Sequence, residues 1–366
     1  EFHLLKYLIL ELKREKNLST SLLVTGSHNS RIFGKTINEI KKSNIKINTK
    51  IDISLFGDSP NHISKSFSIC IKKVSSYFNK TKPDLIVILG DRYEIFACAI
   101  AACFNQIPIA HIHGGESTEG LIDEAIRHSL TKLSHLHFVS TKKYFQRVNQ
   151  LGENKKNIFL VGSLGVEAIK KYRYINKKIL QDLLKINLKE KVALVSYHPE
   201  TLNRKNNNKN FLEVLKALRE LKNFTIIFTM PNADIGYNFI YSEIKKFIKS
   251  NNNSYFFKSL GHEKFFSLCK NSDIMIGNSS SGIIEMPSFK KPSINIGSRQ
   301  EGRVASKSVV NFNYNKKEIL KKINYAISKN FNKKIRKFKN PYHKPFTSKK
   351  IVKIIKNINL DKILIK

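Results

Sequence analysis

Acidic residues are scarce in this chain, which raises the question of an anionic partner. The 366 residues include 28 Asp and Glu against 65 Lys and Arg, so the formal net charge is +37. Arginine is also scarce, since only 11 of the 65 basic residues are Arg, and the lysines are scattered through every segment. A nucleic-acid groove favours clustered Arg with interleaved aromatic residues. The composition therefore indicates a solvated lysine surface and argues against nucleic acid as a partner.

Cysteine is rare, and its spacing excludes a metal cluster. The four cysteines lie singly in apolar helical patterns, with neither a CxxC pair nor a histidine at metal-ligand spacing; they are Cys70, Cys98, Cys103 and Cys269. Such residues are typical of small core side chains in a reducing compartment. We therefore expect no metal site and a cytoplasmic protein.

Long apolar runs and the common phosphate-binding loops are missing. No stretch approaches the roughly 18 uninterrupted apolar residues of a membrane-spanning helix, so no membrane partner is expected. Neither a GxxxxGK[ST] loop nor a GxGxxG turn after a strand occurs, which argues against a P-loop kinase or an NAD enzyme. Hydrophobic residues make up 41% of the chain, enough to build buried cores and to exclude a disordered polybasic chain.

Helix-like and strand-like segments alternate along the whole chain, as they do in parallel α/β units. Short apolar runs predict strands at 21–25, 84–89, 107–112, 135–140, 192–197, 225–228, 273–276 and 293–296. Periodic apolar residues predict helices at 2–16, 63–78, 94–104, 123–133 and 211–221, and the polar run 203–210 is expected to be a surface loop. Length and pattern together predict two similar α/β halves with a cleft between them.

The domain boundary is expected between 162 and 191, where strand signals give way to charged, helix-forming sequence. We predict a first domain at 1–170 and a second domain at 171–345. The Lys-rich tail is expected to be a loop followed by a final helix within 346–366, which packs back on the first domain.

Polar side chains cluster where the strands of the first half end. Ligands of open parallel sheets bind beyond the carboxyl ends of the strands, and six polar residues fall there: Asp91, Arg92, His113, Glu116, Asp123 and Glu124. As first-turn acids, Asp123 and Glu124 are each explained equally well by the helix dipole. The combination of Asp91, Arg92 and Glu116 favours a functional crevice over a structural cluster.

The second half contains a serine-rich segment suited to an anion. Residues 277–282 read Gly-Asn-Ser-Ser-Ser-Gly between a predicted strand and a predicted helix. Free backbone N–H groups there, with the hydroxyls of Ser279 and Ser280, form a cradle for a diphosphate, whereas an ordinary N-cap explains only one serine. Glu285 is placed to accept bonds from ribose hydroxyls, Arg299 to neutralise a phosphate, and His198 to bind phosphate or transfer a proton.

These segments together resemble the hydrolysing UDP-N-acetylglucosamine 2-epimerases of bacterial sialic acid synthesis. The matching segments are LVTGSH (23–28), LGDRYEIF (89–96), HIHGGE (111–116), IDEAIRHSLTKLSHLHF (122–138), YHPET (197–201), GNSSSGIIEMPS (277–288) and INIGSRQEGRV (294–304). The resemblance covers essentially the whole chain in order. It implies two Rossmann-like domains facing across a cleft, as in the glycosyltransferase-B fold. It also implies conversion of UDP-N-acetylglucosamine and water to N-acetylmannosamine and UDP, without metal, NAD or any other cofactor.

The resemblance also implies roles for single residues. The reaction passes through a glycal, so one group must remove the C2 proton and another must return a proton to the opposite face. The implied acid/base set is Asp91, Glu116 and Asp123, with Glu124 adjacent and His113 in the same motif. The implied UDP-binding set is Arg92, His198, Asn232, Ser279, Ser280, Glu285 and Arg299. Relatives are commonly oligomers, so a homodimer or homotetramer is expected.

Two departures from the family pattern stand out. His113 occupies a position where several branches of the family have Glu, so the role of that carboxylate either moves to Asp91 or Glu116 or is taken by the imidazole. The chain also starts inside the first turn of the family pattern, without the opening strand and its Arg. Our hypothesis is an amino-terminally incomplete copy that lacks on the order of ten residues, whose absence leaves both neighbouring strand edges exposed.

Other functions are compatible with the sequence. The same chemistry on UDP-N,N'-diacetylbacillosamine, on a route to legionaminic acid, is the nearest alternative. A nucleotide-sugar-binding protein without catalysis is a second. A non-hydrolysing epimerase is disfavoured, because the HIHGGE and SRQEGR segments resemble the hydrolysing branch.

Overall fold

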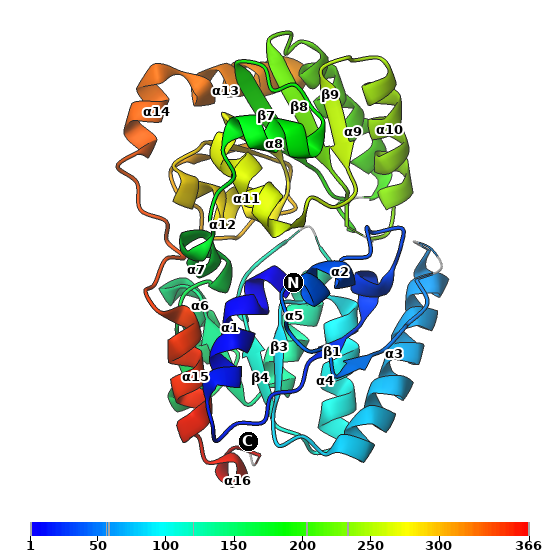
Figure 1. Ribbon diagram of the computed structural model, residues 1–366, viewed down its shortest axis with the longest axis vertical. Helices are drawn as coiled ribbons and strands as arrows, with labels where there is room; N and C mark the ends of the chain where they lie inside the picture. Colours follow the sequence, from blue (N-terminus) through cyan, green and yellow to red (C-terminus); the bar gives the residue numbers. More distant parts are fainter. Residues whose placement is uncertain are drawn as a thin grey trace.

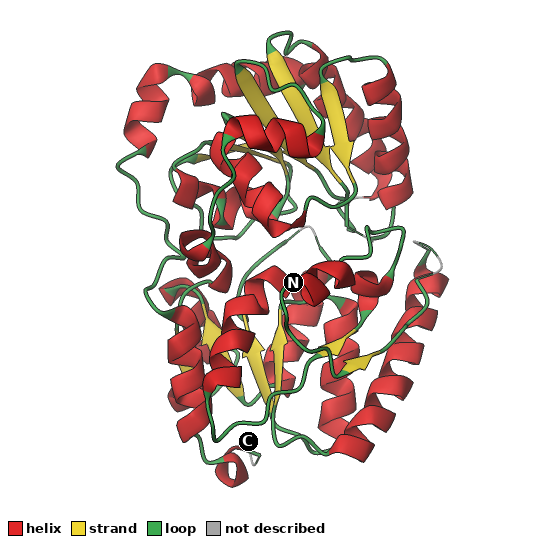
Figure 2. Cartoon of the chain, viewed as in Figure 1, coloured by secondary structure: helices red, strands yellow, loops and turns green. Residues whose placement is uncertain are grey.

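The computed structural model describes residues 2–55, 57, 59–119, 121–202, 204–232 and 234–364. Within them the chain forms an α/β structure with parallel sheets in two domains, which lie one above the other (Figure 1, Figure 2). The predicted fold class is confirmed. The domain limits at 170 and 345 stay a prediction.

The first half contains two separate parallel sheets. A two-stranded sheet pairs β1 (Leu23–Val24) with β2 (Thr49–Lys50), and a four-stranded sheet has the order β3-β4-β5-β6. The strands of the larger sheet are β3 (Ile86–Leu89), β4 (Ile109–Ile112), β5 (Leu136–Val139) and β6 (Ile158–Leu160). The helices of the first half are α1 (Phe2–Arg14), α2 (Ile37–Lys42), α3 (Pro60–Thr81), α4 (Tyr93–Phe104), α5 (Asp123–Leu133), α6 (Lys142–Gln150) and α7 (Leu164–Lys171), with short 3-10 helices at Gly26–Asn29 and Lys155–Asn157.

The second half is built on one six-stranded parallel sheet with the order β12-β11-β10-β7-β8-β9. The strands are β7 (Lys191–Ser196), β8 (Phe224–Thr229), β9 (Ser254–Phe257), β10 (Ile274–Gly277), β11 (Ser293–Ile296) and β12 (Val309–Phe312). The helices are α8 (Lys177–Leu184), α9 (Arg204–Arg219), α10 (Tyr237–Lys249), α11 (Gly261–Asn271), α12 (Ser280–Ile284), α13 (Lys316–Ile327) and α14 (Lys329–Ile335), with a 3-10 helix at Met286–Phe289. Helices α15 (Thr347–Asn357) and α16 (Leu360–Ile363) follow, and α15 packs against α1 and α7 of the first half.

Helix α3 shows why the sequence folds this way locally. Ser59 caps its start by accepting a hydrogen bond from the backbone of His62, and Pro60 occupies the first helical position, where its missing N–H costs nothing. Cys70, Val74 and Phe78 follow at four-residue intervals and are buried in the core of the first half. The 3.6-residue period therefore places one apolar stripe against the sheet.

Two sequence predictions are wrong. Residues 204–210 belong to helix α9 rather than to a loop, whereas Asn203 lies outside the described residues. The apolar face that begins at Phe211 packs into the core, and the helix that it stabilises extends toward the N-terminus through this polar stretch. Within the stretch, buried Asn207 accepts a hydrogen bond from the backbone of Glu200 at 3.4 Å. Three cysteines are core residues as predicted, but Cys103 is exposed on α4.

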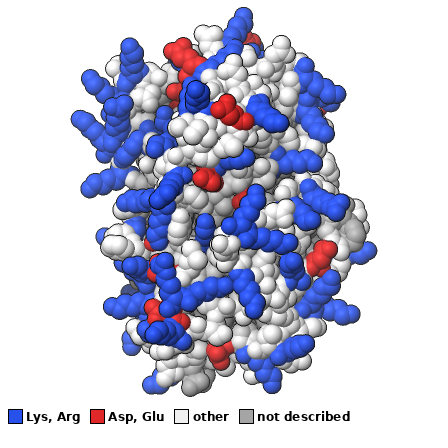
Figure 3. All heavy atoms as spheres, viewed as in Figure 1, with Lys and Arg blue, Asp and Glu red and all other residues white. Residues whose placement is uncertain are grey.

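The positively charged side chains are spread over the surface. Figure 3 shows Lys and Arg spread over the whole visible face rather than gathered in one patch. Along the described part of the chain, no helix combines the length and apolar character needed to cross a membrane.

Candidate functional site

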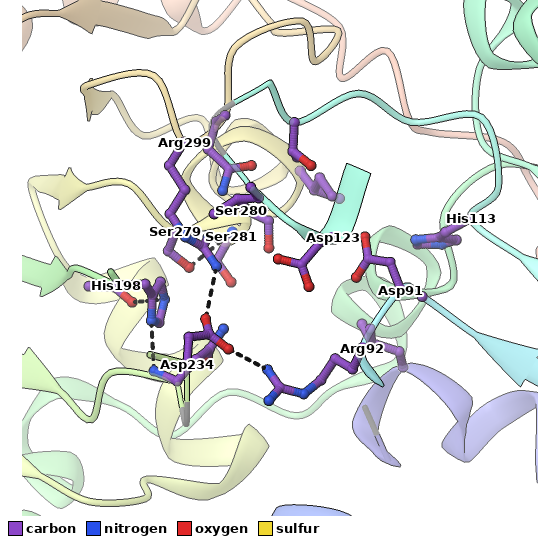
Figure 4. Close-up of a pocket in the computed structure, with 18 of the residues that line it drawn as sticks. Asp91, Arg92, His113, Asp123, His198, Asp234, Ser279, Ser280, Ser281 and Arg299 are labelled. Atoms are coloured by element: carbon purple, nitrogen blue, oxygen red, sulfur yellow. Dashed lines mark hydrogen bonds and ion pairs between the residues drawn. The ribbon is translucent and has the colours of Figure 1, made fainter. Parts of the chain in front are cut away.

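The carboxyl ends of strands from both halves meet at one cavity of about 410 Å³. Figure 4 shows Asp91 and Asp123 on one side of this cavity and the serine segment with Arg299 on the other. Eleven of the twelve residues that the sequence singled out line it: Asp91, Arg92, His113, Glu116, Asp123, His198, Asn232, Ser279, Ser280, Glu285 and Arg299. We name it the reaction cavity.

A buried arginine keeps Asp91 ionised. Asp91 follows Gly90, whose φ of 84° is available to glycine without strain. The Nε of Arg127 donates to the Asp91 carboxylate at 2.8 Å, and its Nη2 donates to the same oxygen. Burial alone raises the pKa of Asp91, but the charges of Arg127 and Arg303 outweigh burial and hold the pKa below its ordinary value. Asp91 is therefore a carboxylate at neutral pH.

Asp123 is shifted in the opposite direction. Burial raises its pKa to about 7, and the carboxylates of Asp91 and Asp234 add to the rise while Arg299 opposes it. A carboxyl group with a pKa near neutrality can both hold and release a proton under physiological conditions. Two carboxyl groups whose pKa values are pushed apart in one cavity are the usual basis for separate acid and base roles.

Glu116 and His113 lie together on the wall next to the second half. The Glu116 carboxylate is ion-paired with Arg303 and accepts a hydrogen bond from Ser140 at 3.3 Å. The Nδ1 of His113 lies 3.6 Å from Glu116, and burial lowers the pKa of this imidazole, so it is neutral at pH 7. His113 has a φ of 72°, an uncommon conformation for a residue with a side chain and one that clusters at functional sites.

Glu124 is the predicted site residue that the structure does not bring into the reaction cavity. Its carboxylate accepts hydrogen bonds from the backbone of Thr118 at 2.5 Å and from Arg127 at 2.7 Å. Burial raises the pKa of Glu124, but His128, Thr118 and Arg127 together lower it to about 2. The geometry gives Glu124 a positioning role, because it holds the arginine that holds Asp91.

The serine segment adopts the predicted strand-to-helix turn. Strand β10 ends at Gly277, and Ser279 caps α12 by accepting from the backbone of Ser281 at 3.4 Å. Gly277 has a φ of 140°, and a Cβ there would lie 2.0 Å from the carbonyl oxygen of Ser196, so only glycine fits. The turn thus presents backbone N–H groups and serine hydroxyls to the cavity.

Glu285 follows α12 and is also buried. Its Oε2 has no hydrogen-bond partner within the described residues. Burial raises the pKa of Glu285 to about 7, although Ser281 and Arg303 oppose the rise. A ligand hydroxyl would supply the hydrogen bond that this carboxyl group lacks.

One acid bridges two arginines of opposite halves. The Nη1 of Arg92 lies 3.3 Å from Oδ1 of Asp234, and the Nη2 of Arg299 lies 3.6 Å from Oδ2 (Figure 4). All three residues line the reaction cavity. The arrangement concentrates two positive charges where an anionic group of a ligand would replace the Asp234 carboxylate.

His198 is held as a neutral imidazole. Its Nδ1 accepts from the backbone N–H of Asn232 at 3.0 Å, so any ring proton is on Nε2. Burial lowers its pKa, and the nearby Arg299 and Arg92 lower it further. Among the residues that the structure describes, no three His, Cys, Asp or Glu side chains are grouped so as to hold a metal ion.

Sequence reasoning missed three charged residues that shape this site, Arg127, Arg303 and Asp234. Arg127 lies one helical turn after Asp123, a spacing that places both on the same side of α5. Arg303 lies in the SRQEGR segment already singled out, and Asp234 lies two residues after Asn232. Arg127 and Arg303 are counterions of predicted acids, and Asp234 is the counterion of two predicted arginines.

Comparison with known proteins gives the family of this chain. A family model described as UDP-N-acetylglucosamine 2-epimerase matches residues 10–356. The chain belongs to this family. The resemblance noted from the sequence motifs is therefore confirmed.

Three relatives place the chain within the 2-epimerase family. A GDP/UDP-N,N'-diacetylbacillosamine 2-epimerase (hydrolyzing) of Campylobacter jejuni is 42% identical over 100% of this chain and 94% of its own length. Polysialic acid biosynthesis protein P7 of Escherichia coli is 39% identical over 98% of this chain and 91% of its own. A UDP-N,N'-diacetylbacillosamine 2-epimerase (hydrolyzing) of Legionella pneumophila is 33% identical over 98% of this chain and 94% of its own.

Solved structures of 2-epimerases share the fold. A co-structure of S. aureus MnaA with UDP has a TM-score of 0.82 at 22% identity, covering 97% of this chain and 93% of that one. The Neisseria meningitidis UDP-GlcNAc 2-epimerase bound to UDP-GlcNAc has a TM-score of 0.80 at 20% identity, covering 97% and 96%. The glycosyltransferase-B-like arrangement predicted for this 2-epimerase is thereby confirmed.

Proposed function

We propose that this chain is a hydrolysing 2-epimerase that converts a UDP-linked 2-acetamido sugar and water to the free C2-epimeric sugar and UDP. The observation that carries this proposal is the pair Asp91 and Asp123, two carboxyl groups of one cavity with pKa values shifted in opposite directions. Membership of the 2-epimerase family supports the same reaction.

In the first step, the bond between C1 and the diphosphate oxygen breaks and its electron pair leaves with UDP. The positive charge that develops at C1 makes the C2 proton acidic enough for a weak base. We assign removal of this proton to the Asp91 carboxylate, after which the C2–H electron pair forms the C1–C2 double bond of a glycal. Arg127 keeps Asp91 ionised and oriented for this step.

In the second step, the glycal is hydrated with inversion at C2. Protonated Asp123 donates to C2 from the face opposite to the proton that was lost, and a water oxygen bonds to C1 and releases its own proton. A pKa of about 7 lets Asp123 be reprotonated by solvent after each turnover. Glu116 and His113 complete the polar wall around the sugar, and the oppositely charged Arg303 balances Glu116.

UDP is assigned to the second half and to the arginines. The diphosphate fits the serine segment, where it would displace Asp234 from Arg92 and Arg299. Glu285 is assigned to the ribose hydroxyls, because its Oε2 lacks a partner in the described structure. His198 and Asn232 support the same wall.

Two sugars are candidates. UDP-N-acetylglucosamine is the sugar that the family resemblance implies, with N-acetylmannosamine for sialic acid synthesis as the product. UDP-N,N'-diacetylbacillosamine is favoured by the names of the relatives that are 42% and 33% identical. The two sugars differ at C4 and C6, away from the reacting carbons, so the proposed chemistry is the same for both.

The test is a product assay with each UDP-sugar in deuterated water. We expect release of UDP, a free sugar of inverted C2 configuration, and deuterium at C2 for at least one substrate. Binding of both UDP-sugars without UDP release or C2 exchange would contradict the proposal and favour a nucleotide-sugar-binding protein. The ratio of kcat/KM for the two substrates identifies the sugar.

A further inference from the structure

A second cavity, of about 330 Å³, lies at the carboxyl ends of β11 and β12. It is formed by Ile283 of α12, the ends of the two strands and the loop 297–305, and we name it the loop cavity. Of the residues that the structure describes, only Gln300 and Arg303 line both the loop cavity and the reaction cavity. The proposed reaction therefore leaves the rest of this cavity without a role.

Amide side chains dominate the polar lining of the loop cavity. Asn295 and Asn311 are direct neighbours in the register of β11 and β12, and the Nδ2 of Asn295 donates to Asn311 at 2.9 Å. Asn313 directly follows β12 and also lines the loop cavity. Three amides thus line this cavity at the edge of the second sheet.

Two buried oxygens in this lining lack hydrogen bonds. Asn295 is 6% exposed and Gln300 is 3% exposed, and neither Asn295 Oδ1 nor Gln300 Oε1 has a partner within the described structure. Buried polar atoms in folded proteins nearly always have a partner, and leaving one without it is unfavourable. Both residues line the loop cavity, so a ligand with hydroxyl or amide N–H donors is the partner that we infer for these oxygens.

The chemistry of the lining selects the class of ligand. Amide groups donate and accept hydrogen bonds at once, as sugar hydroxyls and acetamido groups do. The charged residues of the lining, Glu301 and Arg303, have opposite signs, so the cavity does not select an anion as the reaction cavity does. The volume lies at the lower end of the range for small-molecule sites, which suits one monosaccharide. We propose that the loop cavity is a second binding site for a neutral, free acetamido sugar.

Binding there would reach the reaction cavity through the loop 297–305. Gln300 donates to the carbonyl oxygen of Asn278 at 2.9 Å, and Arg299 donates to the same oxygen at 3.2 Å. Arg303 is ion-paired with Glu116 on the wall of the reaction cavity. A sugar that contacts Gln300 is thus linked through Asn278 to Arg299 at the proposed diphosphate position, and one that contacts Arg303 is linked to Glu116 beside the proposed sugar position. We therefore expect sugar binding in the loop cavity to change the KM for UDP-sugar.

Calorimetric titration of the full chain, saturated with UDP, with N-acetylmannosamine or N-acetylglucosamine tests the proposal. We expect two sugar molecules per chain, one beside UDP and one in the loop cavity. The double variant Asn311→Ala, Asn313→Ala should lose about tenfold or more in affinity at one of them, because each lost hydrogen bond weakens binding. Asn252→Ala, an exposed asparagine next to β9 at the other edge of the same sheet, is the matched control and should bind like the wild type.

Hydrogen exchange of the wild-type chain provides a second measurement that needs no variant. N-acetylmannosamine should slow exchange in 311–313, which lines the loop cavity and not the reaction cavity. Equal affinities of the wild type and the double variant at every sugar site, exchange of 311–313 that sugar does not slow, or binding of inorganic phosphate in preference to sugars would each overturn the proposal. These measurements do not depend on turnover. An active enzyme that binds sugar only beside UDP would contradict this inference and leave the proposed reaction intact. An inactive chain that binds sugar in the loop cavity would contradict only the proposed reaction.

Discussion

The two halves of the molecule differ in how their sheets are joined. The second half has six parallel strands in one sheet, whereas the first half divides its six strands between the β1–β2 pair and the sheet β3–β6. Within the described residues no strand joins β1 to β3, and a small cavity of about 110 Å³ lies beside β1, lined by residues 22–28, apolar residues of α1, and residues of α2 and the start of α4. The edges of β1 and β3 are thus each free on one side.

This difference parallels a division of chemistry. The proposed acid and base, Asp123 and Asp91, come from the divided half, and the serine cradle comes from the continuous half. In the second half, a continuous sheet holds the diphosphate-binding segment rigidly. In the first half, proton transfer depends on side chains that are held in place by their counterions. If this division is right, changes in the first half should affect turnover and changes in the second half should affect UDP binding.

The largest expected effect is on turnover, in the first half. Asp123→Asn removes the proposed proton donor, so kcat should fall by about 10² to 10⁴, the usual contribution of a general acid. UDP affinity should stay within about twofold, and the glycal should accumulate with UDP, because the first step does not use Asp123. Asp91→Asn should instead abolish formation of both UDP and glycal.

Neighbouring Glu124 provides the comparison for this prediction. Because Glu124 acts through Arg127, Glu124→Gln should lower kcat by only about tenfold. Asp182→Asn on the exposed surface of α8 should leave kcat unchanged. An Asp123→Asn enzyme that retains wild-type kcat, or a Glu124→Gln enzyme that is as impaired as Asp123→Asn, would contradict the assignment of roles.

Hydrogen exchange should separate the halves directly. The β1–β2 pair has two strands and a free edge, whereas β7 lies between β10 and β8 in the continuous sheet. Local opening free energies range from near zero up to the global value, so amides of 23–24 and 49–50 should exchange about a hundredfold or more faster than those of 192–195. Equal protection of the two regions would show that the divided sheet opens only with the whole protein.

Much of this arrangement could be predicted from the sequence, because apolar runs of buried parallel strands and the polar residues after them are local signals. Ten of the residues that line the cavity were found from such local signals, and Asn232 from the family resemblance. The sequence could not separate Asp123 from Glu124, since consecutive residues on a helix differ by about 100° in direction and only the packing of α5 decides which one faces the cavity. The bridge from Arg92 to Asp234 and on to Arg299 also escaped prediction, because it depends on how the two halves face each other.

The backbone of the serine segment offers a smaller effect in the second half. Gly277→Ala should destabilise the protein by about 1–3 kcal/mol and weaken UDP binding, because the new Cβ would lie 2.0 Å from the Ser196 oxygen at an unfavourable φ. Gly282→Ala is the matched control, since its Cβ would make ordinary contacts no closer than 3.5 Å. Thermal unfolding and UDP titration of both variants give the answer, and equal behaviour would show that the turn relaxes freely.

The smallest expected effect concerns pH and links the two halves. Proton donation to C2 requires protonated Asp123, so kcat should fall as pH rises through about 7. The Asp234 carboxylate is among the charges that raise the pKa of Asp123. Asp234→Asn removes that charge, whereas Arg92 and Arg299, which lower the pKa of Asp123, remain.

The falling limb of the pH profile should therefore move to lower pH in Asp234→Asn, by a fraction of a unit to about one unit. The free energy of unfolding should also depend on pH. Because the pKa of Asp123 is higher in the folded than in the unfolded protein, the contribution of Asp123 to stability falls as pH rises from about 4 to about 7. Asp182→Asn should leave both curves in place. A limb that moves to higher pH in Asp234→Asn, or that does not move at all, would mean that Asp123 is not the group that titrates in turnover, and the acid of the second step would then have to be sought at Glu285, whose pKa is also raised to about 7.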